Sequence, residues 1–165
     1  MQIYLKNTFL LLFLSCIIAI TYARAQDLPV VTDFTIDAKD SQARQVPILV
    51  LFMSKSCHFC EIVLRDFLIP MQSDHQYDNK VILRQIETSS STKLIDFHGT
   101  TTSHKAFSSK YKMFGVPTVM LFNGEGQVLT SIEGLLTVDY YLAYLENAIN
   151  ESQAKIKANS PRYAE

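Results

Sequence analysis

Residues 49–67, LVLFMSKSCHFCEIVLRDF, join an apolar run to a helical pattern through two cysteines. Residues 47–53 are apolar without interruption, which is typical of a central strand covered on both faces. After the cysteines, apolar side chains recur at helical spacing, at Ile62, Val63, Phe67 and Leu68. We expect this helix to end at Pro70. The C-x-x-C pair of Cys57 and Cys60 thus lies where a strand gives way to a helix.

The rest of the chain alternates between strand and helix patterns. Further strands are predicted over residues 28–36, 80–88, 117–123 and 127–134, and further helices over residues 37–45, 104–114 and 137–156. The polar stretch between residues 88 and 103 separates two of these elements. The crossover between the strands at 47–53 and 80–88 favours parallel, right-handed pairing, whereas NGEG at 123–126 predicts a tight hairpin. This order predicts an α/β fold.

The first 25 residues have the pattern of a cleaved secretory signal peptide. An apolar run at residues 9–20 follows a single positive charge at Lys6 and leads to Ala23-x-Ala25, the spacing that a signal peptidase accepts. A membrane anchor is the alternative, but this run is short of the roughly 20 residues that a spanning helix needs. We therefore predict a signal peptide (1–25), a single domain (26–156) and a flexible C-terminal tail (157–165). No stable membrane anchor is expected after cleavage.

Cleavage would leave a mildly acidic chain with two cysteines. Without Lys6 and Arg24 the chain has 13 basic and 16 acidic residues, so the charge does not suggest a nucleic-acid partner. Cys16 lies in the predicted signal, where FLSC lacks the leucine that lipoproteins usually have three residues before the cysteine. Exported proteins usually spread their cysteines as structural staples, but here both lie in one short C-x-x-C. Such a small loop holds little together, which favours a redox role.

The position of the pair at a predicted helix start favours a reactive thiolate. Unpaired N–H groups and the helix dipole stabilise an anion there and lower the pKa of a thiol. Cys57 comes first and should be the more exposed, so we expect it to be the nucleophile and Cys60 to attack the mixed disulfide. Protonated His58 would lower the pKa of Cys57 further. Ser54 or Ser56 is expected to cap the helix.

These motifs resemble those of the thioredoxin superfamily. SCHFC after PILVLFM is similar to the family's active site, GVPTVMLFN to its cis-proline loop, and GQVLTSIEG with the last helix to its end, so the likeness covers residues 47–150. The resemblance implies a thioredoxin-like fold, with a central mixed β-sheet flanked by helices, and a redox-active Cys57–Cys60 disulfide without a cofactor. It also implies a cis peptide before Pro117, with Val116 offering its backbone to an extended substrate. The alternative is an ordinary trans proline that opens an edge strand.

A finer likeness is to exported bacterial thioredoxin-like proteins associated with sulfur oxidation, the SoxW type. The shared pattern is CxxCE, an apolar helix ending near PM, DFxG in a polar insertion and a VPT strand. In this chain it comprises Cys57, Cys60, Glu61, Pro70, Met71, Asp96, Phe97, Gly99, Val116, Pro117 and Thr118. The resemblance implies a periplasmic protein that acts on protein disulfides and dithiols and is kept reduced by a membrane electron donor.

The chain departs from cytoplasmic thioredoxin around the cysteines. Thioredoxin usually has WCGPC, whereas this chain has SCHFC, with His58 and Phe59 between the cysteines. Leu51 stands where thioredoxin has a buried aspartate that helps to move the proton off the second cysteine. Another group or water must then accept the proton of Cys60. Glu61 is the nearest candidate, and the alternative for Glu61 is a solvated acid in the first helical turn.

The dipeptide between the cysteines bears on the direction of electron flow. A histidine there should stabilise the thiolate and make the disulfide more oxidising than that of thioredoxin. Oxidants of the DsbA kind place their histidine just before the second cysteine, however, and carry a large helical insertion for which this chain has no room. We therefore expect a reductase or interchange protein, with a DsbA-like oxidant as an alternative.

Metal handling is an alternative from a different class of function. Both thiolates together could carry copper or zinc to a partner. His75, His98 and His104 fall in polar segments, where we expect solvated side chains, and no ligand spacing joins them to the cysteines, so no metal site is predicted. Haem attachment would need a histidine at the position of Glu61.

Overall fold

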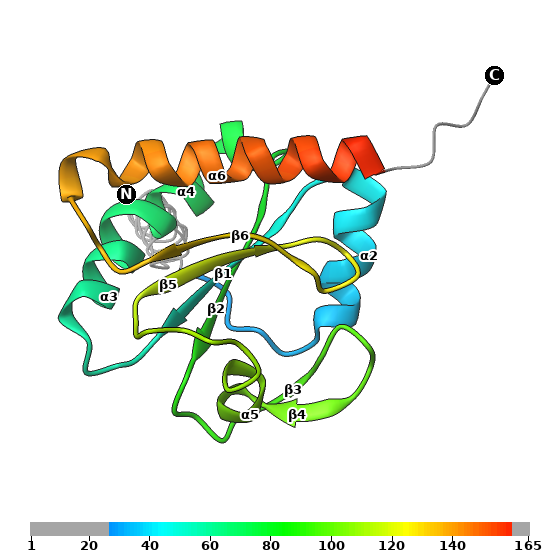
Figure 1. Ribbon diagram of the computed structural model, residues 1–165, viewed down its shortest axis with the longest axis horizontal. Coiled ribbons are helices and arrows are strands. Elements are labelled where there is room, and N and C mark those ends of the chain that lie inside the picture. Colours follow the sequence, from blue (N-terminus) through cyan, green and yellow to red (C-terminus); the bar gives the residue numbers. More distant parts are fainter. Residues whose placement is uncertain (1–26, 160–165) are drawn as a thin grey trace, which may run out of the picture.

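The structure, a computed structural model, describes residues 27–159. In this part of the chain a four-stranded mixed sheet lies between two layers of helices (Figure 1). The predicted signal peptide and residues 160–165 of the predicted tail lie outside the described residues. No helix between residues 27 and 159 is both long and apolar enough to cross a membrane.

The sheet is built around β1, which is Ile48–Met53. It pairs in parallel with β2 (Ile82–Glu87) and antiparallel with β5 (Thr118–Phe122). At the edge of the sheet, β6 (Val128–Glu133) pairs antiparallel with β5. The first five residues of β1 are buried, as expected for a central strand that helices cover on both faces. The parallel crossover and the antiparallel hairpin confirm the predicted α/β fold.

The helices divide between the two faces of the sheet. One face carries α6 (Val138–Asn159) and a continuous helix made of α3 (His58–Ile62), η1 (Val63–Leu68) and α4 (Ile69–Ser73). A short 3₁₀ turn, η2 (His75–Tyr77), follows α4. The other face carries α2 (Phe34–Arg44) and α5 (His104–Ser108). Each face has its own apolar cluster, and the helix that begins after the cysteines therefore packs on the same side as α6.

The helix after the cysteines does not end at Pro70, as the sequence pattern predicts, but continues to Ser73. Proline lacks an N–H donor and its ring clashes with the carbonyl four residues earlier, which usually breaks a helix. Here the preceding segment, η1, is a wider π-helical turn, and Pro70 lies at the beginning of α4. The first turn of a helix tolerates proline. Pro70 therefore does not end the helix.

The strand predicted at residues 28–36 is wrong. Only single bridges form there, between Val30 and Gln85 and between Asp33 and Ile95. The carboxylate of Asp33 accepts a hydrogen bond from the backbone N–H of Thr35 at 2.8 Å and caps α2. A capping carboxylate satisfies the first free N–H groups of a helix, so α2 begins three residues before the predicted start at residue 37.

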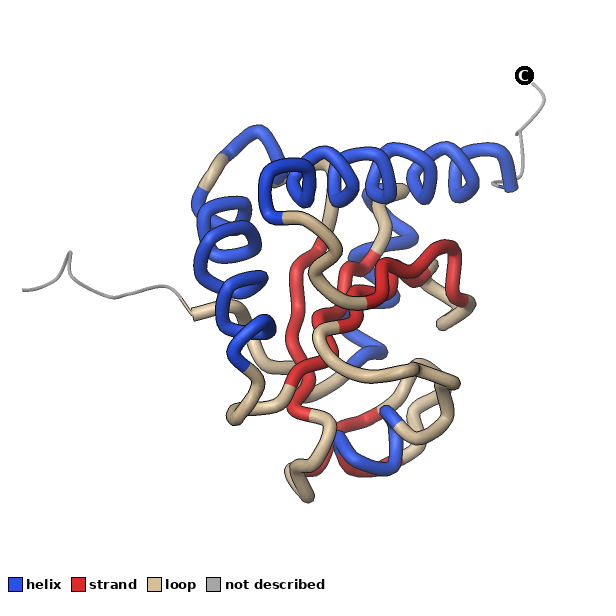
Figure 2. The backbone as a smooth tube through the Cα atoms, turned by 60° about the vertical axis from the view of Figure 1, so that its left-hand side comes forward, coloured by secondary structure: helices blue, strands red, loops and turns tan. Residues whose placement is uncertain are grey.

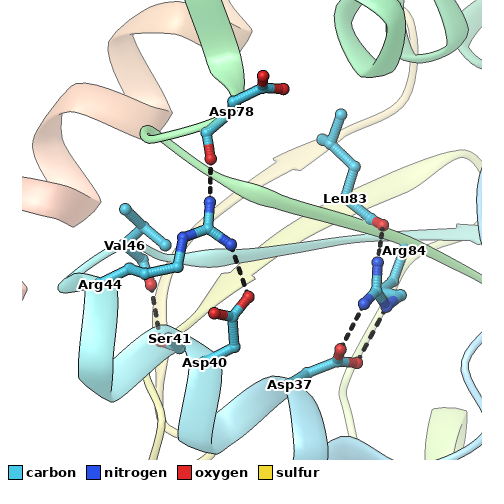
Figure 3. Close-up of polar contacts among 8 residues, drawn as sticks. All are labelled: Asp37, Asp40, Ser41, Arg44, Val46, Asp78, Leu83 and Arg84. Carbon is cyan, nitrogen blue, oxygen red and sulfur yellow. Dashed lines mark hydrogen bonds and ion pairs between the residues drawn. The ribbon is translucent and has the colours of Figure 1, made fainter. Parts of the chain in front are cut away.

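A buried ion pair ties α2 to β2, as Figure 3 shows. Arg84 donates to Asp37 from Nη2 at 2.6 Å and from Nε at 3.1 Å. Burial raises the pKa of Asp37 despite this partner, because a carboxylate loses its hydration inside the protein. At the end of α2, Arg44 pairs with Asp40 and donates to the carbonyl of Asp78. The helix is therefore held at both ends by arginine contacts.

The polar segment before α5 contains a small hairpin, which the sequence pattern does not predict. β3 (Lys93–Ile95) pairs antiparallel with β4 (Thr101–Ser103). In the turn between them, Asp96 accepts hydrogen bonds from the backbone N–H groups of His98 and Thr100, and from Lys110 Nζ at 2.9 Å. Burial opposes ionisation of Asp96, but these bonds lower its pKa below the ordinary value. The DFxG motif thus builds a turn.

His104 joins this hairpin to the rest of the fold. Its side chain is 1% exposed, with Nε2 3.0 Å from the carbonyl oxygen of Val31 and Nδ1 3.3 Å from the backbone N of Glu87. The prediction of a solvated His104 is therefore wrong, because its ring is buried between the backbone groups of Val31 and Glu87. His75 and His98 are exposed, as predicted.

Two helices end at other residues than predicted. α5 covers residues 104–108 of the predicted 104–114, where Ser108 and Ser109 turn their hydroxyls onto the carbonyls four residues earlier. Serine in this geometry competes with helix continuation. α6 continues to Asn159, past the predicted start of the tail at residue 157. Lys155 pairs with Glu151 at 2.6 Å in its last turns, an i, i+4 contact that supports a helix.

Candidate active site

Cys57 itself caps the helix that follows it. Its Sγ accepts a hydrogen bond from the backbone N–H of Cys60 at 3.1 Å, and the helix begins at His58. The prediction that Ser54 or Ser56 caps this helix is wrong, because their hydroxyls instead lie 3.2 Å from each other. A sulfur in the cap position faces free N–H groups and the positive end of the helix dipole. Both stabilise a thiolate.

The two sulfurs of the pair differ in exposure. Cys57 is half-buried, whereas Cys60 is 0% exposed. They form a disulfide, with Cα atoms 5.2 Å apart, so the structure shows the oxidised pair. A partner sulfur can reach Cys57 but not Cys60. This is the order of exposure expected from the sequence.

The loop before β5 lies against Cys57. The Val116–Pro117 peptide bond is cis, and the carbonyl oxygen of Val116 lies 3.6 Å from Cys57 Sγ. Pro117 is buried, and its carbonyl accepts a hydrogen bond from the N–H of Gly134 at 2.8 Å. These contacts hold the backbone of Val116 beside the accessible sulfur. An extended polypeptide could pair with that backbone while its cysteine meets Cys57.

The two residues between the cysteines are exposed. Phe59 is 57% exposed, and the centroids of the His58 and Phe59 rings are 5.9 Å apart. Neither ring contributes to the core, so both are available to a molecule that approaches Cys57. In the turn before the pair, Lys55 lies 3.8 Å from Glu87 at the end of β2.

Neither Leu51 nor Glu61 places a carboxylate beside Cys60. Leu51, at the position of thioredoxin's buried aspartate, is fully buried in β1. Glu61 is exposed, and its Oε1 lies 3.3 Å from Arg65 Nη1 in an i, i+4 ion pair. Glu61 thus has the position of a solvated acid, the second of the two interpretations that the sequence allows.

Comparisons with known proteins agree with this geometry. Residues 21–149 match the thioredoxin-like domain family. The chain belongs to this family. Among solved structures, the long form of spinach chloroplast thioredoxin f is 16% identical, with a TM-score of 0.50 over 75% of this chain and 87% of that one. A poplar thioredoxin h mutant is 13% identical, with a TM-score of 0.50 over 81% and 88%.

A thioredoxin-fold protein from Helicobacter pylori is 19% identical to this thioredoxin-like protein, with a TM-score of 0.49 over 69% of this chain and 81% of that one. At these identities the two solved thioredoxins show the fold alone. The family and the Cys57–Cys60 disulfide at C-x-x-C spacing together support thiol:disulfide oxidoreductase activity.

Two exposed apolar residues, next to segments that meet at the cis-proline loop, are not predicted from the sequence. Phe114, which precedes the Gly-Val-Pro motif, is 97% exposed, and Leu136, in the turn after β6, is 79% exposed. Phe114 falls at the end of a predicted helix, where an aromatic residue suggests packing. Its position beside the Gly-Val-Pro motif is the signal that could have identified it.

The described residues contain no group of three or more His, Cys, Asp or Glu side chains that could hold a metal ion. Cys57 and Cys60 are joined as a disulfide here. If the protein handles a metal, the thiolates of the reduced pair would have to bind it.

Proposed function

We propose that this thioredoxin-like protein is an exported, SoxW-type protein that reduces or exchanges protein disulfides in the periplasm. The observation that carries the proposal is the difference between its sulfurs: Cys57 is half-buried and caps a helix beside Val116, while Cys60 is 0% exposed. Such a pair can open a partner's disulfide with the first sulfur and release the partner with the second. Export follows from the predicted signal peptide.

The proposed reaction starts from the reduced pair. The Cys57 thiolate attacks one sulfur of the partner's disulfide, whose S–S bond breaks, and the partner's other sulfur leaves as a thiolate that takes up a proton. Cys60 then loses its proton to water and attacks the Cys57 sulfur of the mixed disulfide. The Cys57–Cys60 disulfide forms and the partner's second thiol is released, so two electrons pass to the partner.

The insertion between β2 and α5 supports a reductase or interchange role over an oxidant. In this chain it contains a two-stranded hairpin of three residues per strand. Oxidants of the DsbA kind have a large helical insertion instead. A membrane electron donor would restore the dithiol by attack on the same accessible sulfur, Cys57.

Insulin reduction tests the proposal. The mature protein, with dithiothreitol as reductant, should catalyse the reaction. Cys57→Ser should abolish catalysis, and Cys60→Ser should form a mixed disulfide with insulin that persists until a reductant is added. Trapping by Cys57→Ser but not by Cys60→Ser would reverse the assigned roles. Stoichiometric copper or zinc in the purified protein, without turnover, would favour metal handling.

Two further measurements test the finer parts of the proposal. Cell fractionation of the full chain should find the protein in the periplasm, with its new N-terminus directly after Ala25. The reduction potential of the pair should lie nearer to thioredoxin than to DsbA if the protein is a reductase. A DsbA-like potential would assign the opposite direction of electron flow.

A further inference from the structure

Two segments that meet at the sulfur of Cys57 each present an exposed phenylalanine. Phe59, two residues after Cys57, is 57% exposed, and Phe114, two residues before Val116, is 97% exposed. The segments touch where the carbonyl oxygen of Val116 lies 3.6 Å from Cys57 Sγ. Because two residues of chain span at most about 7 Å, both phenylalanines lie close to the reacting sulfur.

The exposure of Phe114 does not come from a loosely attached loop. Before it, Tyr111 and Met113 pack against the apolar cluster under α2 and α5. After it, Thr118 Oγ1 donates a hydrogen bond to the carbonyl of Gly115 at 2.8 Å. These contacts hold the backbone on both sides while the ring faces solvent. The ring thus forgoes the free energy that a buried phenylalanine gains.

Both phenylalanines lie at the end of the sheet that a partner must approach. Phe52 of β1 pairs with Thr118 of β5, so the loop with Phe114 enters β5 where β1 runs into the turn before Cys57 (Figure 2, strands red and loops tan). A polypeptide whose disulfide meets Cys57 therefore covers this end of the molecule.

The reaction itself brings a polypeptide to these two rings. A single exposed aromatic residue elsewhere on a surface would need no explanation. In the mixed disulfide, however, the partner's sulfur is bonded to Cys57, so the residues next to the partner's cysteine come within reach of Phe59 and Phe114. Aromatic side chains bury a large apolar area with few rotatable bonds, which makes them effective contact points.

The charged groups around the site do not favour one sign. Segments 54–61, 111–118 and 133–136 carry two lysines, two glutamates and one histidine, at Lys55, Lys112, Glu61, Glu133 and His58. Lys55 lies 3.8 Å from Glu87 of β2. The carboxylate of Glu61 pairs with Arg65. Apolar contact rather than charge is therefore what can distinguish one partner from another here. An anionic membrane is usually bound by a cluster of lysine and arginine, which these segments do not contain.

We propose that Phe59 and Phe114 are specificity-determining residues, which select partner disulfides with apolar side chains two residues from the exchanging cysteine. This inference rests on the proposed function, because the partner must first engage Cys57. An extended segment advances up to about 7 Å in two residues. Each phenylalanine lies within the same reach of the contact between Cys57 and Val116. Apolar side chains on either side of the partner's cysteine can therefore pack on the two rings.

Two short peptides with a central cysteine, each oxidised to its symmetrical disulfide, test this preference. One carries leucine at the second position on each side of the cysteine, and the other carries serine there. Glycine fills the other positions, and blocked ends leave both peptides uncharged. The rate constant for each with the reduced protein is measured by mass spectrometry of acid-quenched samples. Division by the rate constant for hydroxyethyl disulfide, which has no such side chains, removes changes in the reactivity of Cys57 itself.

The reduced protein should react about fivefold faster with the leucine peptide than with the serine peptide. Phe59→Ser/Phe114→Ser should lower this ratio to less than about twofold, whereas Phe114→Leu, which keeps an apolar side chain, should retain most of it. Val128→Ser is the matched control and should leave the ratio unchanged. Val128 is 44% exposed but pairs with Phe122, opposite the first residue of β1 and thus at the other end of the sheet. Circular dichroism checks that the variants fold.

Several outcomes would overturn the inference. Equal relative rates for the two peptides with the unmodified protein would exclude the preference. A ratio that Phe59→Ser/Phe114→Ser leaves unchanged, or that Val128→Ser lowers as much, would exclude its location. A dimer in sedimentation that Phe114→Ser abolishes would assign the ring to a second copy, and flotation with phosphatidylglycerol vesicles that needs Phe114 would assign it to a membrane. Failure to reduce both hydroxyethyl disulfide and insulin would contradict the proposed function itself.

Discussion

Cys57 is held by contacts from two parts of the chain that are far apart in sequence. The N–H of Cys60 donates to its sulfur at 3.1 Å, and the carbonyl oxygen of Val116 lies 3.6 Å from it. Both neighbours are backbone groups. The environment of the sulfur is therefore set by backbone groups of the fold, and the side chain of His58 is exposed.

Glu61→Gln tests whether the acid after the second cysteine takes part in proton transfer. Glu61 is exposed and paired with Arg65 at 3.3 Å, so we expect the rate of insulin reduction to stay within about twofold of the unmodified protein. The pH profile should also be unchanged. A fall of tenfold or more, with a shifted pH profile, would show that Glu61 accepts the proton of Cys60.

The sequence predicted the disulfide of Cys57 and Cys60 but not its surroundings. The spacing of Cys57 and Cys60, and their place at a strand-to-helix junction, are local features that a sequence pattern contains. That the sulfur of Cys57 is itself the cap was missed, because Ser54 and Ser56 are the residue types that capping preferences favour. Phe114 was missed because its exposure depends on where α5 ends.

Among the secondary-structure elements, α2 and β2 depend on the buried pair of Asp37 and Arg84. The side chain of Asp37 is 6% exposed and that of Arg84 is 26% exposed. A buried carboxylate that loses its partner remains as an uncompensated charge, which costs more than the pair contributes. The contact therefore holds α2 against β2, even though Asp37 ionises less readily than usual.

Arg84→Met should lower the free energy of unfolding by about 3 kcal/mol at neutral pH. The pKa of Asp37 is already raised by burial, and removal of Arg84 raises it further, because the group that favours the ionised form is gone. Below that raised pKa, Asp37 takes up a proton and the charge disappears. The deficit of the variant should therefore shrink as the pH falls toward about 4, which urea denaturation at several pH values measures.

Arg65→Met is the matched control for this prediction. Its pair with Glu61 is 68% and 61% exposed on the two side chains, so the variant should cost less than about 1 kcal/mol. Equal losses in the two variants, or a deficit in Arg84→Met that does not change with pH, would contradict the role of the buried charge.

Elements with a continuous apolar pattern were predicted from the sequence, and those decided by single polar residues were not. The run at residues 47–53 is typical of a covered strand, and β1 confirms this prediction. The strand predicted at 28–36 is wrong because one hydrogen bond to Asp33 starts a helix instead. The hairpin of β3 and β4 was missed because its turn depends on Asp96, which is satisfied by backbone groups that no pattern shows.

For the molecule as a whole, His104 connects three segments that are distant in sequence. It contacts the carbonyl of Val31 before α2 and the N–H of Glu87 at the end of β2, and it begins α5. With Nδ1 accepting from an N–H group, Nε2 carries the proton and donates to Val31. The ring thus satisfies two backbone groups at once in a site that is 1% exposed.

His104→Ala should destabilise the protein by about 2 to 4 kcal/mol, because it leaves a cavity and two backbone groups without their partner. His98→Ala changes an exposed histidine in the same insertion and should cost less than about 0.5 kcal/mol. Thermal or urea denaturation compares them. Similar stabilities for the two variants would show that His104 does not join these segments.

The proposed activity requires that the fold hold the sulfur of Cys57 as an accessible thiolate at the start of a helix. The most direct test is the pKa of the Cys57 thiol in the reduced protein. It can be followed by the ultraviolet absorbance of the thiolate, with Cys57→Ser to separate the contribution of Cys60. The position of this sulfur at the helix cap predicts a pKa well below that of free cysteine. A pKa at or above the free value would contradict it.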